Sequence, residues 1–459
     1  MKLPLGRVAD FTRAEGSFDR DEVASGYSID SRTLQPGELF FAVKGERFDG
    51  HDFVEAALER GAVGAVVAGT QAARYKQKSR LLAVPEPLEA LQRLGRAVRR
   101  LWNKPLLAVT GSAGKTTTKD SIAKLLETKF RVLKSEGNLN NQFGLPLQLL
   151  KLEPEHELAV VELGMNHAGE ITALAAIAQP DIGVVTNVAP VHLGFFESVA
   201  DIARAKYALI QSLSANGTAV LNADDEFVSQ FGRDFAGRVL TFGIDHSAAV
   251  TAENIKELGL EGSHFDVVTN GNRARARLGL IGRHNIYNAL AAVTVAMDRG
   301  LSLEEAAAAL TLLTPSDKRG QVLEVAGATV INECYNSNPR ALDFVVDALA
   351  GMPTKGRRIV VAGEMLELGP ATDELHRHAG EHMAERGIDV VVGVRGAAQH
   401  IVNSASARGT RAEFVETSEA AGEWLAREVK PGDLVLLKAS RGVKLEKALE
   451  TWKNVISNR

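Results

Sequence analysis

The chain has 459 residues, which is too long for one compact core and is typical of about three domains. Hydrophobic residues make up 45% and charged residues 24%, as in an ordinary globular protein. Lys and Arg number 53 against 57 Asp and Glu, and this net charge of −4 argues against a nucleic-acid partner. No apolar run approaches the roughly 20 residues that cross a bilayer. The first ten residues lack the apolar core of a signal peptide, and the single cysteine, Cys334, fits a reducing compartment. We therefore expect a soluble, cytoplasmic protein with no membrane partner.

Residues 1–103 predict a small N-terminal α/β domain. Strand-like runs at 38–43 and 62–68 enclose a helix-like run at 52–60. A basic helical run over 88–102 then leads to Lys104-Pro105, where the proline favours a domain boundary.

Residues 104–314 predict a central domain with a mostly parallel sheet flanked by helices. Strand-length apolar runs alternate here with helical periodicity, which is typical of such sheets. A helix-rich part is expected to close the domain near Leu313. Ligands of these folds bind at the carboxyl ends of the strands. The expected strands are 106–109, 158–161, 182–185 and 219–221.

Residues 315–459 predict a third, Rossmann-like α/β domain, which follows the linker-like Thr314-Pro315-Ser316-Asp317. The alternation of strands and helices restarts beyond this linker. The expected strands are 328–331, 359–362, 390–394 and 434–437.

The strongest local signal is a glycine-rich loop with Lys115 and Thr116 between a predicted strand and a predicted helix. Backbone N–H groups of such a loop surround phosphate oxygens, the lysine adds a positive charge, and the Thr116 hydroxyl is suited to Mg²⁺. Val109 stands where the common G-x-x-x-x-G-K-[ST] pattern has its first glycine. A structural turn is the alternative, but strand, loop, Lys-Thr and helix together favour ATP binding. The predicted ATP-binding residues are Gly111, Ser112, Ala113, Gly114, Lys115, Thr116 and Thr117.

Three further side chains are candidate metal ligands. Glu162 ends an apolar run, where a carboxylate is well placed for Mg²⁺, although a solvated loop glutamate is the alternative. His192 also follows a predicted strand, but a loop histidine alone is more typical of a surface position. Lys206 lies on the apolar stripe of the helical run 198–213. Either its ammonium reaches water past this stripe, or carbamylation converts it to a carboxylate that binds a second Mg²⁺. Spacing leaves both alternatives open.

In this order, the glycine-rich loop, Glu162, His192 and Ala203-Arg204-Ala205-Lys206 resemble the Mur ligases. The run that begins Gly282-Arg283-His284-Asn285 is similar to the family signature G-x-H-N-x-x-N-x-x-A-A. The resemblance covers nearly the whole chain. Its other parts include Asp30-Ser31-Arg32-Thr33, Gly137-Asn138-Leu139-Asn140-Asn141, Tyr335-Asn336-Ser337-Asn338-Pro339, Met365-Leu366-Glu367-Leu368-Gly369 and Lys438-Ala439-Ser440-Arg441-Gly442.

The resemblance implies an ATP-dependent ligase of peptidoglycan precursor synthesis. It would join D-alanyl-D-alanine to a UDP-N-acetylmuramoyl tripeptide through an acyl phosphate, with Lys115, His192 and Lys206 as catalytic residues. Two Mg²⁺ ions are implied, one held by Thr116 and Glu162, the other by His192 and a carbamylated Lys206. We expect a monomer. The implied ATP contacts are His284, Asn285, Arg319 and Glu333, and the implied substrate contacts are Ser31, Arg32, Asn140, Asn141, Tyr335, Asn336 and Asn338.

Two positions depart from the family pattern, because Glu333 and Glu364 stand where aspartate is usual. Each change keeps the charge and lengthens the arm by one methylene. Three other functions compete with the D-alanyl-D-alanine ligase. They are another Mur-type or folylpolyglutamate-type amide ligase, a phosphate-loop switch or transport ATPase, and a catalytically silent nucleotide-binding module. The motif from Tyr335 to Pro339 argues against the first of these. The third residue of the tripeptide is left open.

Overall fold

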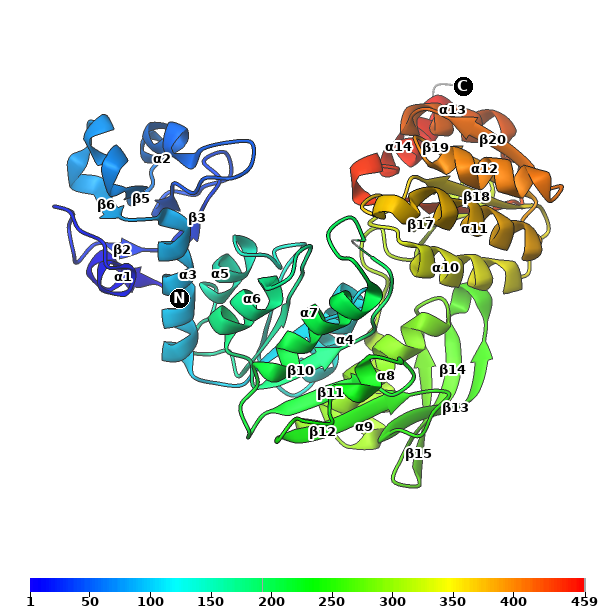
Figure 1. The fold of residues 1–459 in the computed structure, drawn as a ribbon, viewed down its shortest axis with the longest axis horizontal. Coiled ribbons are helices and arrows are strands. Elements are labelled where there is room, and N and C mark those ends of the chain that lie inside the picture. The colour runs from blue at the N-terminus through cyan, green and yellow to red at the C-terminus, as the bar shows by residue number, and fades with distance from the viewer. Residues whose placement is uncertain (192, 458–459) are drawn as a thin grey trace.

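The computed structural model describes residues 1–191 and 193–457, whose strands form sheets of two, four, nine and six strands (Figure 1). The four-stranded sheet of the N-terminal region is parallel, in the order β3-β4-β5-β6, and β1 and β2 form a small antiparallel pair beside it. The expected strands at 38–43 and 62–68 are β4 and β5, whereas β6 was not expected. The elements are β1 (Leu3–Pro4), α1 (Leu5–Thr12), β2 (Val23–Ala24), β3 (Gly26–Ser28), β4 (Glu38–Phe41), α2 (Val54–Glu59), β5 (Gly64–Ala68), β6 (Leu81–Val84) and α3 (Pro87–Trp102).

Helix α3 leads from this sheet to the next one. It begins with Pro87 after Glu86, whose side chain accepts a hydrogen bond from the backbone of Leu88, and it ends at Asn103 in the left-handed conformation. Its apolar stripe is buried, and it packs against α5 and α6 of the central region. Because Pro105 cannot continue the helix, the chain turns directly into the first central strand. The domain limits 1–103, 104–314 and 315–459 stay predictions.

The central sheet has the order β15-β14-β13-β12-β11-β10-β7-β9-β8 and is parallel from β8 to β13. One face packs on α5, α6 and α7, and the other packs on α4, α8 and α9. The predicted, mostly parallel sheet with helices on both faces is therefore confirmed. Its elements are β7 (Leu106–Thr110), α4 (Lys115–Leu126), β8 (Val132–Lys134), α5 (Gly144–Leu149), β9 (Leu158–Glu162), α6 (Glu170–Ala178), β10 (Ile182–Val185), α7 (Val199–Gln211), β11 (Thr218–Asn222), β12 (Arg238–Gly243), β13 (Val250–Glu257), β14 (Ser263–Thr269), β15 (Asn272–Leu278), α8 (Arg283–Asp298) and α9 (Leu303–Ala309).

The expected helix-rich end of the central region is only partly correct. Helices α8 and α9 are present, but β13, β14 and β15 come before them as an antiparallel extension of the sheet. In β15 the arginines 273, 275 and 277 are exposed, while Ala276 and Leu278 are buried. This period of two is typical of a strand with one solvated face, and it overrides the helical expectation.

The C-terminal sheet has the order β16-β17-β21-β18-β19-β20 and is parallel except for the antiparallel edge pair β16–β17. Helices α10, α11 and α12 cover one face, and α13 and α14 cover the other. The predicted Rossmann-like architecture is confirmed, although β16 and β20 were not expected. The elements are β16 (Gln321–Val325), β17 (Ala328–Glu333), α10 (Pro339–Gly351), β18 (Arg358–Gly363), α11 (Thr372–Glu385), β19 (Val390–Val394), α12 (Ala398–Ala407), β20 (Arg411–Val415), α13 (Ser418–Glu428), β21 (Leu434–Lys438) and α14 (Glu446–Ser457).

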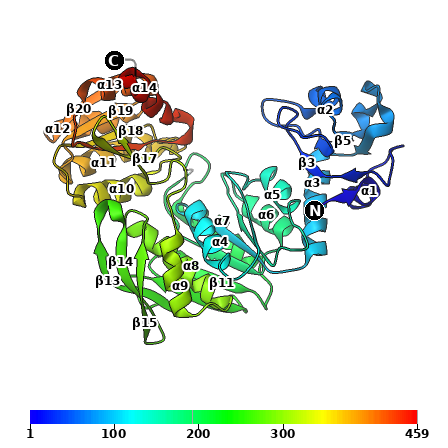
Figure 2. The same cartoon turned by 180° about the vertical axis from the view of Figure 1, so that it is seen from behind.

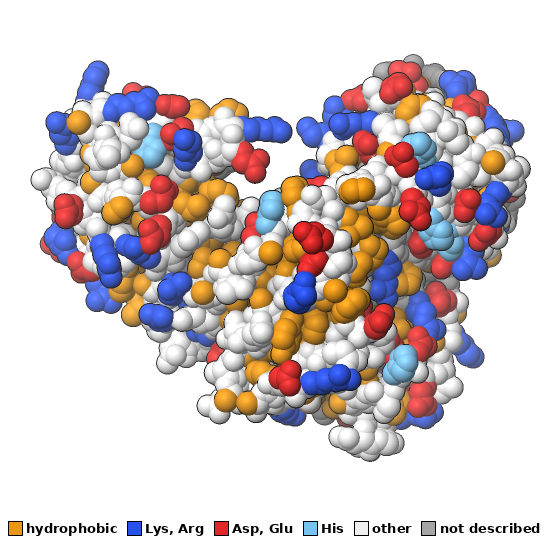
Figure 3. All heavy atoms as spheres, in the orientation of Figure 1, with side chains coloured by type: hydrophobic (Ala, Val, Ile, Leu, Met, Phe, Trp, Pro, Cys, Tyr) orange, Lys and Arg blue, Asp and Glu red, His pale blue; other side chains and the backbone are white. Residues whose placement is uncertain are grey.

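The N-terminal and C-terminal regions lie at opposite ends of the central sheet, as both ribbon views show (Figures 1 and 2). The surface is hollowed between these two lobes (Figure 3). In the part of the chain that the structure describes, no helix combines the length and apolar character that a membrane span requires. Because β7 lies between β9 and β10, the loops that follow these three strands meet at one edge of the sheet.

Candidate active site

A cleft of about 1260 Å³ lies at the carboxyl ends of the central strands and extends to the C-terminal region. It brings together most of the side chains that the sequence singled out. Gly111, Lys206, Ser31 and Arg32 are not among its lining residues, and His192 lies outside the described residues. The predicted site residues that line it are Ser112, Ala113, Gly114, Lys115, Thr116, Thr117, Asn140, Asn141, Glu162, His284, Asn285, Arg319, Glu333, Tyr335, Asn336 and Asn338.

The glycine-rich loop connects β7 to the N-terminus of α4, which begins at Lys115. Gly111 and Gly114 have φ angles of 151° and 78°, in the region that favours glycine. A Cβ on Gly111 would lie 1.9 Å from Oγ1 of Thr186, and one on Gly114 would lie 2.5 Å from Oδ1 of Asn288. Any side chain at either position would therefore displace the loop from its neighbours.

Residues 186–189, which follow β10, hold the glycine-rich loop from one side, and we call them the clasp. The side-chain oxygen of Asn187 accepts a hydrogen bond from the backbone N–H of Ala113 (2.9 Å), and its carbonyl accepts one from Ser112 (2.9 Å). The Ser112 hydroxyl in turn accepts the N–H of Ala189 (2.9 Å). No role for the clasp was predicted from the sequence. The signal in the sequence was Asn187, a polar residue that closely follows the predicted strand 182–185.

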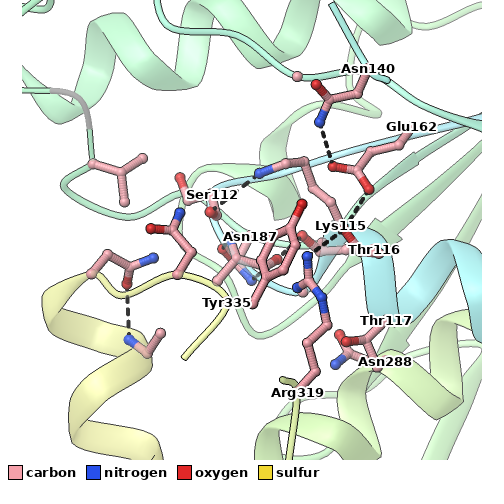
Figure 4. Close-up of a pocket in the computed structure, with 18 of the residues that line it drawn as sticks. Ser112, Lys115, Thr116, Thr117, Asn140, Glu162, Asn187, Asn288, Arg319 and Tyr335 are labelled. Carbon is pink, nitrogen blue, oxygen red and sulfur yellow. Dashed lines mark hydrogen bonds between the residues drawn. The ribbon is translucent and has the colours of Figure 1, made fainter. Parts of the chain in front are cut away.

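Two cations flank the N-terminus of α4. The ammonium of Lys115 donates to the carbonyl of Gly111 (2.8 Å). Burial lowers the pKa of Lys115, Glu162 raises it and Arg319 lowers it. Arg319, from the C-terminal side, donates to the Thr116 hydroxyl (3.1 Å) and stacks at 3.6 Å on the ring of Tyr335 (Figure 4). The two regions thus concentrate positive charge where the terminal phosphates of a nucleotide would lie.

Glu162, at the end of β9, directs its carboxylate at the same helix terminus (Figure 4). One oxygen accepts the Thr116 hydroxyl (2.6 Å), and the other accepts the amide of Asn140 (2.8 Å). Its backbone N–H donates to the Ser135 hydroxyl (3.1 Å), while the buried ammonium of Lys119 donates to the Ser135 carbonyl (2.5 Å). Hydrogen bonds of both the side chain and the backbone of Glu162 therefore hold its carboxylate in place.

The side-chain oxygens of Thr116 and Glu162 fit one Mg²⁺, because they are hard donors that meet beside the phosphate loop. Proteins usually hold Mg²⁺ with one or two carboxylates plus substrate phosphates. Among residues 1–191 and 193–457, no group of three or more His, Cys, Asp or Glu side chains is arranged to hold a metal by itself.

Lys206 lies on α7, and its side chain is only 2% exposed. Burial, and secondarily the positive charge of Lys115, holds its pKa well below the usual value for lysine. A neutral amine is the form that reacts with CO₂, so this environment is compatible with carbamylation.

The far side of the cleft is formed by α8 and by the ends of β17 and β21. Burial lowers the pKa of His284 to about 4, so that the imidazole is neutral, and its Nδ1 is buried with no hydrogen-bond partner. The amide of Asn285 donates to the carbonyl of Ile281 (2.8 Å). Glu333 lies 3.3 Å from the ammonium of Lys438, which also donates to the carbonyl of Asn336 (3.1 Å). From the sequence, Lys438 was noted only as part of a family motif, and no contact with Glu333 was predicted for it.

Several predicted substrate contacts also support the local backbone. The side chain of Asn338 caps α10 by accepting the N–H of Ala341 (2.9 Å), and Asn141 accepts the N–H of Gly144 (2.9 Å). The side chain of Asn336 accepts the N–H of the next residue (2.9 Å). In the N-terminal region Arg32 is exposed and pairs with Asp30 (2.7 Å). Ser31 adjoins this pair, in the turn after β3.

Glu364, the second departure from the family pattern, lies directly after β18. Its carboxylate accepts the backbone N–H of Ala397 (3.1 Å) at the start of α12, and it is 3.8 Å from Arg395. The longer side chain of Glu364 thus interacts with other residues of the C-terminal region.

Comparison with known proteins places this geometry in a family. Residues 24–99 match the Mur ligase family catalytic domain, 109–296 the Mur ligase middle domain, and 318–441 the Mur ligase glutamate ligase domain. The chain is 32% identical to the UDP-N-acetylmuramoyl-tripeptide–D-alanyl-D-alanine ligase of Bacillus subtilis over 93% of both chains. It is 36% identical to the ligase of the same name from Escherichia coli over 89% of both chains.

Solved structures agree with these sequence relatives. MurF from Acinetobacter baumannii superposes with a TM-score of 0.89 at 29% identity, over 99% of both chains. MurF ligase from Thermotoga maritima, in complex with ADP, superposes with a TM-score of 0.83 at 28% identity, over 95% of this chain and 99% of that one. The resemblance noted in the sequence is confirmed, and this chain belongs to the Mur ligase family.

Proposed function

We propose that this chain is the ATP-dependent ligase that adds D-alanyl-D-alanine to a UDP-N-acetylmuramoyl tripeptide in peptidoglycan synthesis. One observation carries the proposal. The glycine-rich loop, Glu162 and Arg319 meet in one cleft, on a chain whose near full-length relatives bear the name of this ligase. The cytoplasmic location and the monomeric state stay predictions.

The nucleotide enters with its phosphates on the glycine-rich loop. The N-terminus of α4 and Lys115 attract the phosphate oxygens, and Arg319 closes over them from the C-terminal side. His284, Asn285 and Glu333 face the same cleft and hold the nucleoside. The unpartnered Nδ1 of His284 is available to the base as a hydrogen-bonding group.

The reaction joins two anions, the γ-phosphate and the carboxylate of the tripeptide. An oxygen of the carboxylate attacks the γ-phosphorus, ADP leaves, and an acyl phosphate forms. The amine of D-alanyl-D-alanine then attacks the acyl carbon, and phosphate leaves with the oxygen that attacked first. Lys115 and Arg319 offset the repulsion between the two anions. Bound Mg²⁺ would neutralise charge on the transferring phosphoryl group, with Thr116 and Glu162 as its ligands.

A second metal position is proposed next to the first, with His192 and a carbamylated Lys206 as its ligands. The lowered pKa of Lys206 supports this role, because it increases the fraction of the amine in the neutral form that reacts with CO₂. Closure of the cleft between the central and C-terminal regions would exclude water, which otherwise hydrolyses the acyl phosphate.

Mass spectrometry of the products tests the proposed function. The purified chain is incubated with ATP, Mg²⁺, D-alanyl-D-alanine and each UDP-muramyl peptide in turn. We expect one new species, which equals the tripeptide precursor plus the dipeptide minus water and forms only with ATP. Phosphate release without either acceptor would instead indicate an ATPase. Ligation of glutamate or of a single amino acid would indicate another amide ligase of the family.

Shortening Glu333 to aspartate tests its proposed role. The carboxylate now lies 3.3 Å from the buried ammonium of Lys438, and removing one methylene withdraws it from this partner. We expect Glu333→Asp to raise the KM for ATP about fivefold, the cost of weakening one largely desolvated ion pair near the nucleotide. Initial rates at varied ATP measure this change. An unchanged KM would show that nucleotide binding does not depend on the longer arm of Glu333.

A further inference from the structure

Arg340 connects the C-terminal region to the central region, and it belongs to none of the sequence motifs described above. It is the second residue of α10, and its guanidinium NH1 donates to the carbonyl of Val188 (3.3 Å). The same nitrogen lies 3.5 Å from the carboxylate of Asp225. The side chain of Arg340 is 40% exposed, whereas that of Asp225 is only 3% exposed. The contact therefore links the surface of one region to a buried acid of the other.

Asp225 is committed to the backbone of the central region. One of its oxygens accepts the N–H of Val188 (3.0 Å), and the other accepts the N–H groups of Phe227 (3.2 Å) and Val228 (3.1 Å). Arg340 is the one cation that pairs with it among the described residues. The buried carboxylate thus holds the amide of Val188, while Arg340 holds the carbonyl of the same residue.

Val188 is the centre of the clasp. The residues on either side of it, Asn187 and Ala189, hydrogen-bond directly to Ser112 and Ala113 in the phosphate loop. Both polar backbone groups of Val188 are therefore occupied by Asp225 and Arg340, and its two neighbours hold the loop. A displacement of Arg340 would release one of these two anchors.

Arg340 also contacts the nucleoside side of the cleft. Its guanidinium lies 5.5 Å from the ring centre of Phe344, one turn further along α10. Phe344 in turn stacks on His284 of α8, with ring centres 6.0 Å apart and an interplanar angle of 19°. The same side chain therefore adjoins both the clasp and the stacked pair, which belong to opposite ends of the nucleotide site.

We propose that Arg340 is a positioning residue that couples docking of the C-terminal region to the affinity of the phosphate loop for nucleotide. With α10 docked, Arg340 fixes Val188, the clasp stays in place, and the loop amides keep the geometry that phosphate requires. By thermodynamic linkage, bound nucleotide strengthens docking to the same degree. The kinetic consequences rest on the proposed function, whereas the effect on nucleotide binding does not.

Calorimetric titration of the full-length chain with ADP and Mg²⁺ tests this coupling. We expect Arg340→Ala to weaken ADP binding about three- to tenfold, the range for one partly exposed charged hydrogen bond. Arg340→Lys keeps the charge near Asp225 and should recover part of the loss. Arg377→Ala is the matched control, because the exposed side chain of this arginine of α11 hydrogen-bonds only to a carbonyl of its own helix among the described residues. In ligation assays the KM for ATP should rise, while the KM for D-alanyl-D-alanine stays within twofold.

A double-mutant cycle with Asp225→Asn separates this route from a direct contact between Arg340 and the nucleotide. If Arg340 acts through Asp225 and Val188, the double variant binds ADP about as well as the weaker single variant. Strictly additive losses would overturn the proposal, as would an Arg340→Ala variant with unchanged ADP affinity.

Thermal unfolding of each variant checks the fold, and Arg340→Ala alone remains decisive if Asp225→Asn does not fold. If the wild-type chain binds ADP but ligates nothing, the proposed function fails while the ADP comparison still decides the role of Arg340.

Discussion

Replacement of Lys115 by alanine is expected to abolish ATP-dependent phosphate release, with a fall of about 10³-fold or more. The ammonium lies at the N-terminus of α4, where it now donates to the Gly111 carbonyl and would turn to the phosphates of the nucleotide. Lys115 is the only lysine in the glycine-rich segment 109–118, and Arg319 reaches the loop from the other side of the cleft. Without Lys115, the transferring phosphoryl group loses its nearest fixed positive charge.

The measurement is release of phosphate from ATP in the presence of tripeptide precursor and D-alanyl-D-alanine. Lys129→Ala is the matched control, because the ammonium of this exposed lysine just beyond α4 donates only to the carbonyl of Gly300 among the described residues. It should retain nearly full activity. A Lys115→Ala variant with activity near that of the wild type would refute the assignment of the phosphate loop.

Replacement of Lys206 by alanine is expected to lower ligation by about 100-fold or more, since loss of a metal ligand exceeds the 10- to 100-fold effect of an outer partner. If a carbamate is the functional group, a short-chain carboxylate such as acetate should restore part of the activity. Lys206→Arg is the informative comparison, because its guanidinium stays charged and forms no carbamate. We expect it to be inactive, and added acetate should not rescue it because the side chain still fills the space.

Ligation rates at increasing acetate, with chloride at the same ionic strength as the control, measure the rescue. Full activity of Lys206→Ala would contradict the carbamate role. So would a complete lack of rescue in a variant that folds and binds ADP like the wild type.

The parts of the site that depend on short sequence segments were predictable. The glycine-rich loop carries its strand, its glycines and its Lys-Thr pair within about ten residues, so one stretch of sequence predicted both its place in the fold and its exposure to the cleft. The position of Glu162 was predictable for the same reason. A carboxylate that ends a buried apolar run lies at the carboxyl end of a strand. The overall α/β architecture also followed from the alternation of strands and helices.

Contacts between distant segments were not predictable in this way. The clasp acts on the phosphate loop only because β10 pairs with β7, and the two strands are separated by more than 70 residues. Arg340 reaches Asp225 across 115 positions, through the docking of α10 on the central region. The strands β13 to β15 were missed for a different reason. In β15 an alternating Arg-Ala pattern was visible in the sequence, but alanine favours helices as well as filling the buried face of a strand.

Transfer of an oxygen isotope tests the central claim most directly, namely that the carboxylate of the precursor attacks the γ-phosphate. The carboxylate of the tripeptide precursor is labelled with ¹⁸O at both oxygens, and the released phosphate is analysed by mass spectrometry. If an acyl phosphate forms, each phosphate carries one ¹⁸O atom and the new amide keeps the other. Phosphate without ¹⁸O, released at the rate of ligation, would show that ATP is hydrolysed by water and would contradict the account.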